Sequence, residues 1–180
     1  MFWQLARSLG PVWLSASFLL CSASAAFGQA LEYDVKAAFL LNFTKFIEWP
    51  PSAFPGSSAP FAICILGKDP FGGALDAVVA GETVNGHPLI VRRLTEKPPA
   101  QSCQILYTGE PVKEAAQTLG SVGPGMLTVG EGDAFLRGGG MVAFVTENRR
   151  VRFDINRSAA EAAGLKLSSR LLNVARSVQK

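Results

Sequence analysis

The stretch Phe61-Ala-Ile-Cys-Ile-Leu66, which is followed at once by Gly67-Lys68-Asp69-Pro70, decides the fold of this chain. An unbroken apolar run that ends at a glycine is typical of a strand buried on both faces. Asp69 suits the cap of a helix and Pro70 its first position, so we expect a helix from there to about Ala80. A buried strand that leads directly into a helix is typical of an α/β sheet.

The rest of the chain continues this alternation of strands and helices. Further strands are expected on both sides of the turn Asn85-Gly86, and then at residues 105–107, 126–129, 141–145 and 150–155. Further helices are expected at residues 31–49, 111–119, 158–164 (capped by Ser158) and 168–178, with a glycine-rich loop at residues 130–140. This order predicts a single-domain α/β sandwich with a mixed β-sheet flanked by helices.

The helix expected at residues 31–49 has a regular apolar stripe. The stripe consists of Val35, Phe39, Phe43, Phe46 and Ile47, at helical spacing. Lys36 falls on the opposite face, and the prolines after Trp49 end the helix. The stripe predicts packing on the sheet of this chain, and a docking surface for a partner is the alternative interpretation.

The first thirty residues differ from the rest of the chain. Arg7 is the only charge ahead of an apolar run at residues 12–20, and small residues follow that run. A positive start, an apolar centre and a small-residue end are the three parts of a secretory signal peptide. We therefore expect residues 1–30 to be a leader that is cleaved between positions 25 and 30, and residues 31–180 to be one exported domain.

Two other interpretations of the leader are less favoured. The apolar run is about half as long as the roughly 20 residues that a membrane-spanning helix needs, so no membrane insertion is expected. A lipid-attached cysteine normally follows a small residue, whereas Leu20 precedes Cys21.

Removal of Arg7 with the leader lowers the formal charge from +3 by one unit, which leaves too little charge to favour nucleic acid as a partner.

Cys64 and Cys103 are the two cysteines of the exported domain. An even pair of cysteines in an exported chain predicts a disulfide, and two buried free thiols are the alternative. A bridge between them would close a loop of about 40 residues, for which chain entropy contributes on the order of 4 kcal/mol.

The sequence contains no motif of a known catalytic or metal site. The single histidine, His87, follows the Asn-Gly turn and is expected to be exposed. A zinc site built from histidine and cysteine would need more ligands than the chain offers. Glu131 and Asp133 lack the spacing of a calcium-binding EF-hand. We therefore expect a protein without enzymatic activity and without a cofactor.

Two groups of residues are candidate contacts for a partner or a small anion. Gly67, Lys68 and Asp69 lie between a strand and a helix N-terminus, where an ordinary capped turn is the alternative. The second group, on the last hairpin, is Arg149, Arg150 and Arg152, with Arg92 and Arg93 as further members if all five share one sheet edge. Charge protection of that edge is the alternative, and Glu147 and an outward-facing Asp154 would form exposed ion pairs there.

Several landmarks occur in order along the exported domain. They are Tyr33-Asp-Val-Lys-Ala-Ala-Phe39, Phe46-Ile-Glu-Trp49-Pro50, Cys64-Ile-Leu-Gly67, Gly138-Gly139-Gly140, Arg152-Phe153-Asp-Ile155-Asn156 and Ser168-Ser169-Arg170-Leu171-Leu172. This ordered set resembles the YfiR family. The resemblance implies a periplasmic regulator without enzymatic activity, which binds the periplasmic domain of an inner-membrane diguanylate cyclase, inhibits it and so lowers cyclic di-GMP.

The resemblance also implies a set of partners. It implies a homodimer, and an outer-membrane lipoprotein with a peptidoglycan-binding domain that sequesters the regulator. The alternative role is that of a periplasmic small-ligand-binding protein or an accessory subunit of a membrane histidine kinase or TonB-dependent receptor. Only the Cys64–Cys103 bridge is carried over from the family, because residues 141–156 contain no second cysteine pair.

Overall fold

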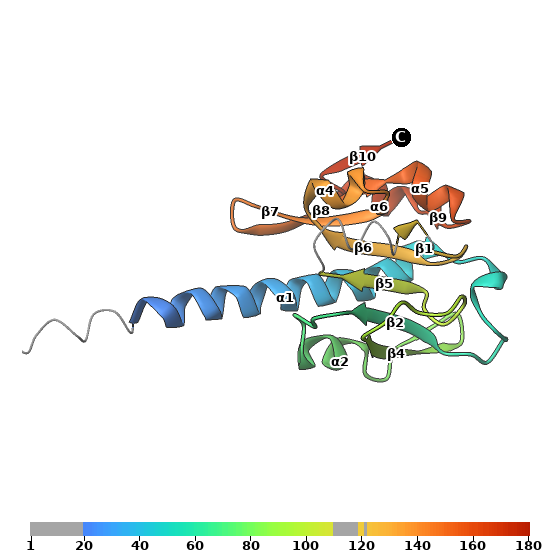
Figure 1. The fold of residues 1–180 in the computed structure, drawn as a ribbon, viewed down its shortest axis with the longest axis horizontal. Helices are drawn as coiled ribbons and strands as arrows, with labels where there is room; N and C mark the ends of the chain where they lie inside the picture. Colours follow the sequence, from blue (N-terminus) through green and yellow to red (C-terminus); the bar gives the residue numbers. More distant parts are fainter. Residues whose placement is uncertain (1–19, 110–118, 121) are drawn as a thin grey trace, which may run out of the picture.

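A mixed β-sheet organises the chain in the computed structural model, which describes residues 20–109, 119–120 and 122–180 (Figure 1). In spatial order its strands are β10 (Ser177–Gln179), β8 (Arg150–Asn156), β7 (Val142–Glu147), β6 (Leu127–Glu131), β5 (Ile105–Thr108), β2 (Phe61–Leu66), β4 (His87–Leu94) and β3 (Thr83–Val84). Neighbouring strands from β4 to β7 are parallel, and so are β8 and β10, whereas β3 and β8 run antiparallel to β4 and β7. The predicted α/β fold with a mixed sheet is confirmed.

Helices cover both faces of this sheet. Among the described residues they are α1 (Leu20–Phe46), the short 3₁₀ helix η1 (Pro51–Ala53), α2 (Gly73–Val79), α4 (Gly132–Arg137), α5 (Arg157–Ala162) and α6 (Ser169–Val174). The helices α1, α2, α5 and α6 pack on one face and enclose the main apolar core. The helix α4 and the segment that leads into β5 pack on the other face, around two smaller clusters.

The order of the parallel strands creates a crevice at one edge of the sheet. In chain order β2, β4, β5, β6 and β7 are first to fifth, and in space they lie as 2-1-3-4-5, the order of a flavodoxin-like doubly wound sheet. The chain leaves β2 toward α2 on the main-core face, and it leaves β5 toward Leu119 and Val122 on the opposite face. Two neighbouring strands whose connections depart to opposite faces leave a crevice between their carboxyl ends.

The predicted disulfide joins Cys64 of β2 to Cys103, just before β5. The two Cα atoms are 5.8 Å apart, which is a normal separation for a bridge. Both residues are buried beside Ala62, Leu66 and Met126 in the cluster on the second face. The prediction of a disulfide is confirmed, and the alternative of two free thiols is wrong.

The N-terminal helix differs from the prediction at its end and in its buried face. α1 ends at Phe46, because Ile47 and Glu48 form the short strand β1 (Ile47–Glu48), which pairs antiparallel with β9 (Lys166–Leu167). Val35 is 45% exposed, whereas Lys36, which was expected on the outer face, is 2% exposed. The helix is thus rotated toward Lys36, and this orientation is possible because carboxylates meet the buried ammonium group.

The glycine-rich stretch at residues 130–140 is not a loop throughout, since it contains α4. Phe135 of α4 is buried, and a Cβ at Gly130 or at Gly140 would overlap its ring. Gly139 has a φ of 97°, in the region that favours glycine. Gly130 and Gly140 therefore make room for the ring of Phe135, and Gly139 lets the chain turn after the helix. From the sequence these glycines predicted a loop, because glycine content alone does not reveal such packing.

The C-terminal region also differs from the prediction. Asn156, rather than Ser158, caps α5, because its side chain accepts the N–H of Ala159. The last helix ends at Val174, and β10 follows it along β8. Asp154 is 2% exposed rather than outward-facing, since Arg176 from the turn before β10 donates to its carboxylate, with Nε 2.9 Å from Oδ1.

Two sequence predictions fall partly outside the described residues. The helix expected at 111–119 lies there except for Leu119, which is helical. Residues 1–19 of the leader lie there too, and α1 already includes residues 20–30, so cleavage between positions 25 and 30 stays a prediction. In the part of the chain that the structure describes, no helix is both long enough and apolar enough to cross a bilayer.

Candidate functional site at the carboxyl ends of the parallel strands

A pocket of about 460 Å³ lies at the carboxyl ends of β2, β5 and β6. Its walls come from Tyr33 of α1, from Lys68 and Asp69 in the turn after β2, and from Tyr107 and Glu131 at the ends of β5 and β6. The first turns of α1 extend beyond this edge of the sheet (Figure 1). The pocket thus occupies the crevice between β2 and β5, the place where doubly wound sheets bind ligands.

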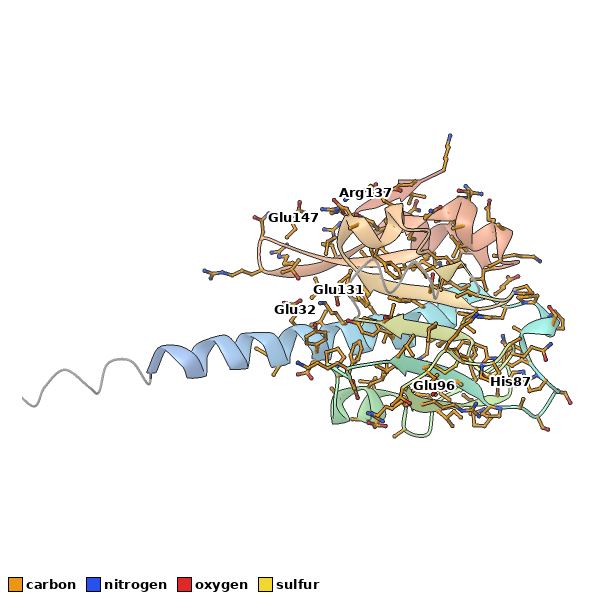
Figure 2. All side chains as sticks on the ribbon, viewed as in Figure 1. Glu32, His87, Glu96, Glu131, Arg137 and Glu147 are labelled. Carbon is orange, nitrogen blue, oxygen red and sulfur yellow. A yellow bond between two sulfur atoms is a disulfide. The ribbon has the colours of Figure 1, made fainter. Side chains whose placement is uncertain are left out.

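A buried ion pair forms one wall of this pocket. Lys36 Nζ lies 2.9 Å from each carboxylate oxygen of Glu131 and 2.6 Å from Oε1 of Glu32. The hydroxyl of Tyr107 donates to Oε1 of Glu131 at 2.8 Å, and Thr146 donates to Glu32 at 3.1 Å. Figure 2 shows Glu32 and Glu131 together at this end of the molecule. The network fastens α1 to the ends of β5, β6 and β7.

The protonation states of this network follow from its contacts. Burial opposes the charge on Lys36, but the hydrogen bonds to Glu32 and Glu131 outweigh it, so the pKa of Lys36 is raised. The hydrogen bond from Lys36 lowers the pKa of Glu32. Burial, together with the charge of Glu131, raises the pKa of Tyr107. At neutral pH Lys36 and Glu32 are therefore charged, and the phenol of Tyr107 is neutral.

Aromatic rings support the same wall. Tyr33 meets Phe71 edge to face with ring centroids 5.5 Å apart, and Phe71 meets Tyr107 in the same way at 4.7 Å. The ammonium of Lys36 lies 4.5 Å from the centre of the Tyr33 ring. These contacts pack the buried charge against apolar and aromatic surface, and they hold both tyrosines in place.

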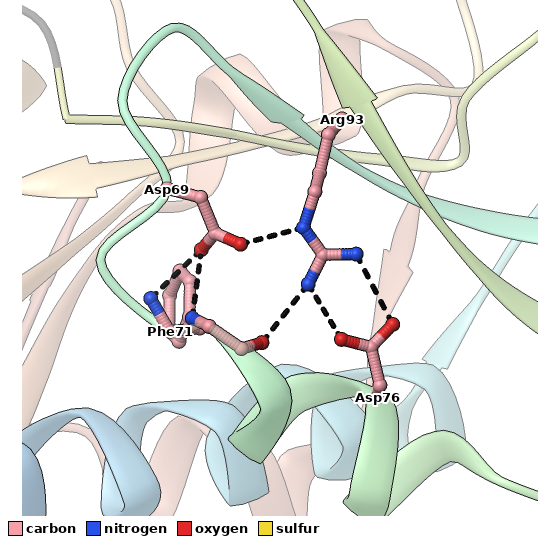
Figure 3. Close-up of polar contacts among 5 residues, drawn as sticks. Asp69, Phe71, Asp76 and Arg93 are labelled. Carbon is pink, nitrogen blue, oxygen red and sulfur yellow. Dashed lines mark hydrogen bonds and ion pairs between the residues drawn. The ribbon is translucent and has the colours of Figure 1, made fainter.

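The turn after β2 is held by Arg93 of β4 (Figure 3). Nε of Arg93 donates to Asp69 at 2.7 Å, Nη2 donates to Asp76 at 2.5 Å, and Nη2 also donates to the carbonyl of Gly72 at 2.9 Å. The other oxygen of Asp69 accepts the backbone N–H of Phe71 at 2.7 Å. Asp69 thus closes the turn, and the prediction that it caps the helix is wrong, because α2 begins only at Gly73.

Lys68 differs from the other charged residues of the pocket. It is exposed and lies in the turn that Arg93 holds. Within the residues that the structure describes, Lys68 forms no hydrogen bond and no ion pair. Lys68 was a candidate contact from the sequence, and the structure places it in the lining of this pocket, where none of the described residues pairs with its ammonium group.

The stability of the network should depend on pH at both extremes. The lowered pKa of Glu32 means that its stabilising contribution is present above its ordinary value of 4.5 and is lost as the pH falls below it. The raised pKa of Lys36 means that its contribution is present below 10.5 and is lost as the pH rises above it. We expect urea midpoints to be level between these limits and to fall outside them.

The variant Glu32→Gln tests the acid limb of this profile. We expect it to lose less than about 1 kcal/mol at neutral pH, because Glu32 is partly exposed, and to show a shallower fall at low pH than the wild type. An acid limb with the same slope in both proteins would show that Glu32 does not contribute.

The sequence allowed all five candidate arginines to share one sheet edge, but the structure separates them. Arg92 and Arg93 lie on β4, whereas Arg150 and Arg152 lie on β8, with β2, β5, β6 and β7 between them. Arg149, in the turn from β7 to β8, has a φ of 60°. Arg93 binds Asp69 and Asp76. It therefore positions the turn after β2 and does not belong to a basic surface patch with the arginines of β8.

His87 is not an exposed turn residue. It begins β4, its ring stacks on Phe54 with centroids 4.1 Å apart, and Nδ1 lies 2.5 Å from the carbonyl oxygen of Ala59. With Trp49 and Phe61 it lines a second pocket of about 510 Å³ at the opposite end of the strands, as the label in Figure 2 indicates. The described residues contain no cluster of His, Cys, Asp and Glu that could hold a metal ion.

Sequence reasoning missed Lys36, Tyr107 and the role of Glu131. Lys36 follows Glu32 by four residues, a spacing that brings the two side chains together on a helix. Tyr107 and Glu131 each stand at or next to the end of a strand that was predicted correctly. These signals are compatible with ordinary surface residues, and only the packing of α1 across the strand ends joins them.

A sequence model of the YfiR/HmsC-like family matches residues 33–176. The chain belongs to the YfiR/HmsC-like family. No curated protein matches the chain. YfiR-like proteins are known as periplasmic regulators, and the family is not a known enzyme class. The match begins at Tyr33 and ends at Arg176, so it includes every residue that lines the carboxyl-end pocket except Ala30, together with the disulfide and the partner of Asp154.

Proposed function

We propose that this YfiR-like protein is a non-enzymatic regulator in the periplasm that binds the periplasmic domain of an inner-membrane diguanylate cyclase and inhibits it. The observation that carries the proposal is the family match over residues 33–176. In this role the protein works as a homodimer, and an outer-membrane lipoprotein that binds peptidoglycan sequesters it and releases the cyclase. Lower cyclic di-GMP in the cytoplasm is the consequence of inhibition.

Three features of the structure support a non-enzymatic role in the periplasm. A lysine that acts as a base needs a lowered pKa, whereas that of Lys36 is raised by its carboxylate partners although burial opposes this. Tyr107 already donates to Glu131, and burial raises the pKa of its phenol. The Cys64–Cys103 bridge is of the kind that persists in oxidising compartments such as the periplasm.

Deletion of the gene should raise cyclic di-GMP, because inhibition of the cyclase is lost. The nucleotide is measured in extracts of wild-type, deletion and complemented cells. The full chain should restore the wild-type level. A chain that lacks residues 1–30 should not restore it, since the inhibited domain lies across the membrane. An unchanged level in the deletion strain would contradict the cyclase proposal.

Capture of the tagged protein from cross-linked envelopes distinguishes the possible membrane partners. The cyclase should be recovered with it if the proposal is correct. Recovery of a histidine kinase or a TonB-dependent receptor in place of a cyclase would favour the accessory-subunit role. The tagged protein, purified alone without cross-linking and analysed by light scattering, should give the mass of a dimer, and a monomer at cellular concentration would contradict the proposed homodimer.

A further inference from the structure

The carboxyl-end pocket carries unbalanced charge of both signs. Glu32 and Glu131 share one ammonium group, that of Lys36, and Asp69 and Asp76 share one guanidinium group, that of Arg93. Each of these clusters therefore has one carboxylate more than it has cations. A ligand that only carried negative charge would be repelled by both clusters.

The third charged element of the pocket is a cation, Lys68, that has no partner among the residues that the structure describes. Lys68 stands in the turn between β2 and α2, and among the described residues nothing neutralises it. Glu131, with 36% of its side chain exposed, reaches the pocket from the end of β6. Of the described residues that line the pocket, Lys68 thus presents an unpaired ammonium group, and Asp69 and Glu131 present carboxylates from clusters in which carboxylates outnumber cations.

We propose that this pocket binds a small zwitterion, with the ligand's ammonium group facing Glu131 and Asp69 and its anionic group facing Lys68. The volume of about 460 Å³ admits a molecule of the size of an amino acid. Tyr33 and Tyr107 supply rigid walls, and Arg93 holds the turn that carries Lys68, so the site is largely formed before the ligand arrives. Binding of a zwitterion at this pocket does not depend on the identity of the membrane partner.

The test uses probes that separate the two charges of a zwitterion. 4-Aminobutyrate carries both charges, whereas butyrate and butylamine each carry one. With the protein exported by its own leader and purified from the periplasm, titration calorimetry and thermal shift should detect 4-aminobutyrate and should find both single-charge probes weaker. The homologues from glycine to 6-aminohexanoate then define the preferred distance between the two charges. Binding by none of these zwitterions, or equal binding by butyrate, would overturn the proposal.

A reversal of charge at Lys68 gives a test that loss of folding cannot imitate. Lys68→Ala should weaken binding of 4-aminobutyrate about tenfold, as loss of one charge-assisted hydrogen bond implies. Lys68→Glu should transfer the preference to 1,4-diaminobutane. The matched control Lys166→Ala changes an exposed lysine that does not line the pocket, and it should leave binding unchanged. If Lys68→Glu bound 4-aminobutyrate as the wild type does, the assignment of Lys68 would be wrong.

Discussion

The substitution Lys36→Met should lower the free energy of unfolding by about 3 kcal/mol. The buried ammonium group of Lys36 is the shared partner of Glu32 and Glu131, and its removal leaves two carboxylates close together without a counter-charge. Loss of one member of a buried ion pair costs roughly 3–5 kcal/mol. We expect the low end, because the two carboxylates are 31% and 36% exposed and water can reach them.

Urea denaturation at pH 7 measures this effect against a control on the same helix. Lys45→Met removes the ammonium of an exposed ion pair with Glu82 and should change stability by less than about 1 kcal/mol. The double variant Lys36→Met with Glu131→Gln should recover part of the loss, since it removes one of the two carboxylates. If Lys36→Met were no more destabilising than Lys45→Met, the network would not be holding α1 to the sheet.

Removal of the disulfide should have an effect of similar size. Cys64 and Cys103 are separated by 39 residues in the chain, and the entropy of closing a loop of this length corresponds to roughly 4 kcal/mol as an upper value. The double variant Cys64→Ala with Cys103→Ala should therefore unfold at a clearly lower urea concentration. The segment that leads into β5 would then be attached to β2 by packing on the second face of the sheet and by the hydrogen bonds between Gln104 and Ala62, without a covalent link.

Reductant provides the control for this second prediction. The wild type in dithiothreitol should approach the double variant, and the double variant should be insensitive to reductant. The oxidised, unfolded exported domain should show no free thiol on labelling. Equal urea midpoints for the oxidised and the reduced wild type would contradict a stabilising role for the bridge.

The strands could be predicted from the sequence because their signals are local. Phe61–Leu66 is apolar throughout and is buried throughout. The turn at Asn85 and Gly86 has φ values of 52° and 85°, which are those that the Asn-Gly pair favours. Two cysteines in a domain that was expected to be exported were sufficient to predict the Cys64–Cys103 bridge. These features need only neighbouring residues or a simple count.

The candidate site could be predicted only in part. Gly67, Lys68 and Asp69 were selected because they follow a buried strand, and Lys68 and Asp69 line the pocket. The helix cap assigned to Asp69 was wrong because α2 begins only at Gly73, and Asp69 instead accepts the N–H of Phe71 and the guanidinium of Arg93 from β4. No local pattern reports a contact between residues 24 positions apart.

The wrong placements of Val35 and Lys36 on α1 have the same origin. Helical periodicity placed Val35 inside and Lys36 outside, since it assigns a lysine to water. Lys36 is buried because Glu131, 95 residues away in the chain, accepts two hydrogen bonds from it. A charged side chain can be buried where hydrogen-bonding partners of opposite charge exist. The local sequence pattern around Lys36 does not indicate that Glu131 is such a partner.

The sequence by itself determined the α/β class, the family, the central strands and the bridge, because hydrophobic patterning, turn residues and cysteine count act over short distances along the chain. Only the tertiary structure decided which face of α1 is buried, which arginine holds the turn after β2, and that a pocket with charges of both signs lies between β2 and β5. Those outcomes depend on which strands become neighbours and on which helix crosses their ends, and such pairings between distant residues form only when the sheet assembles.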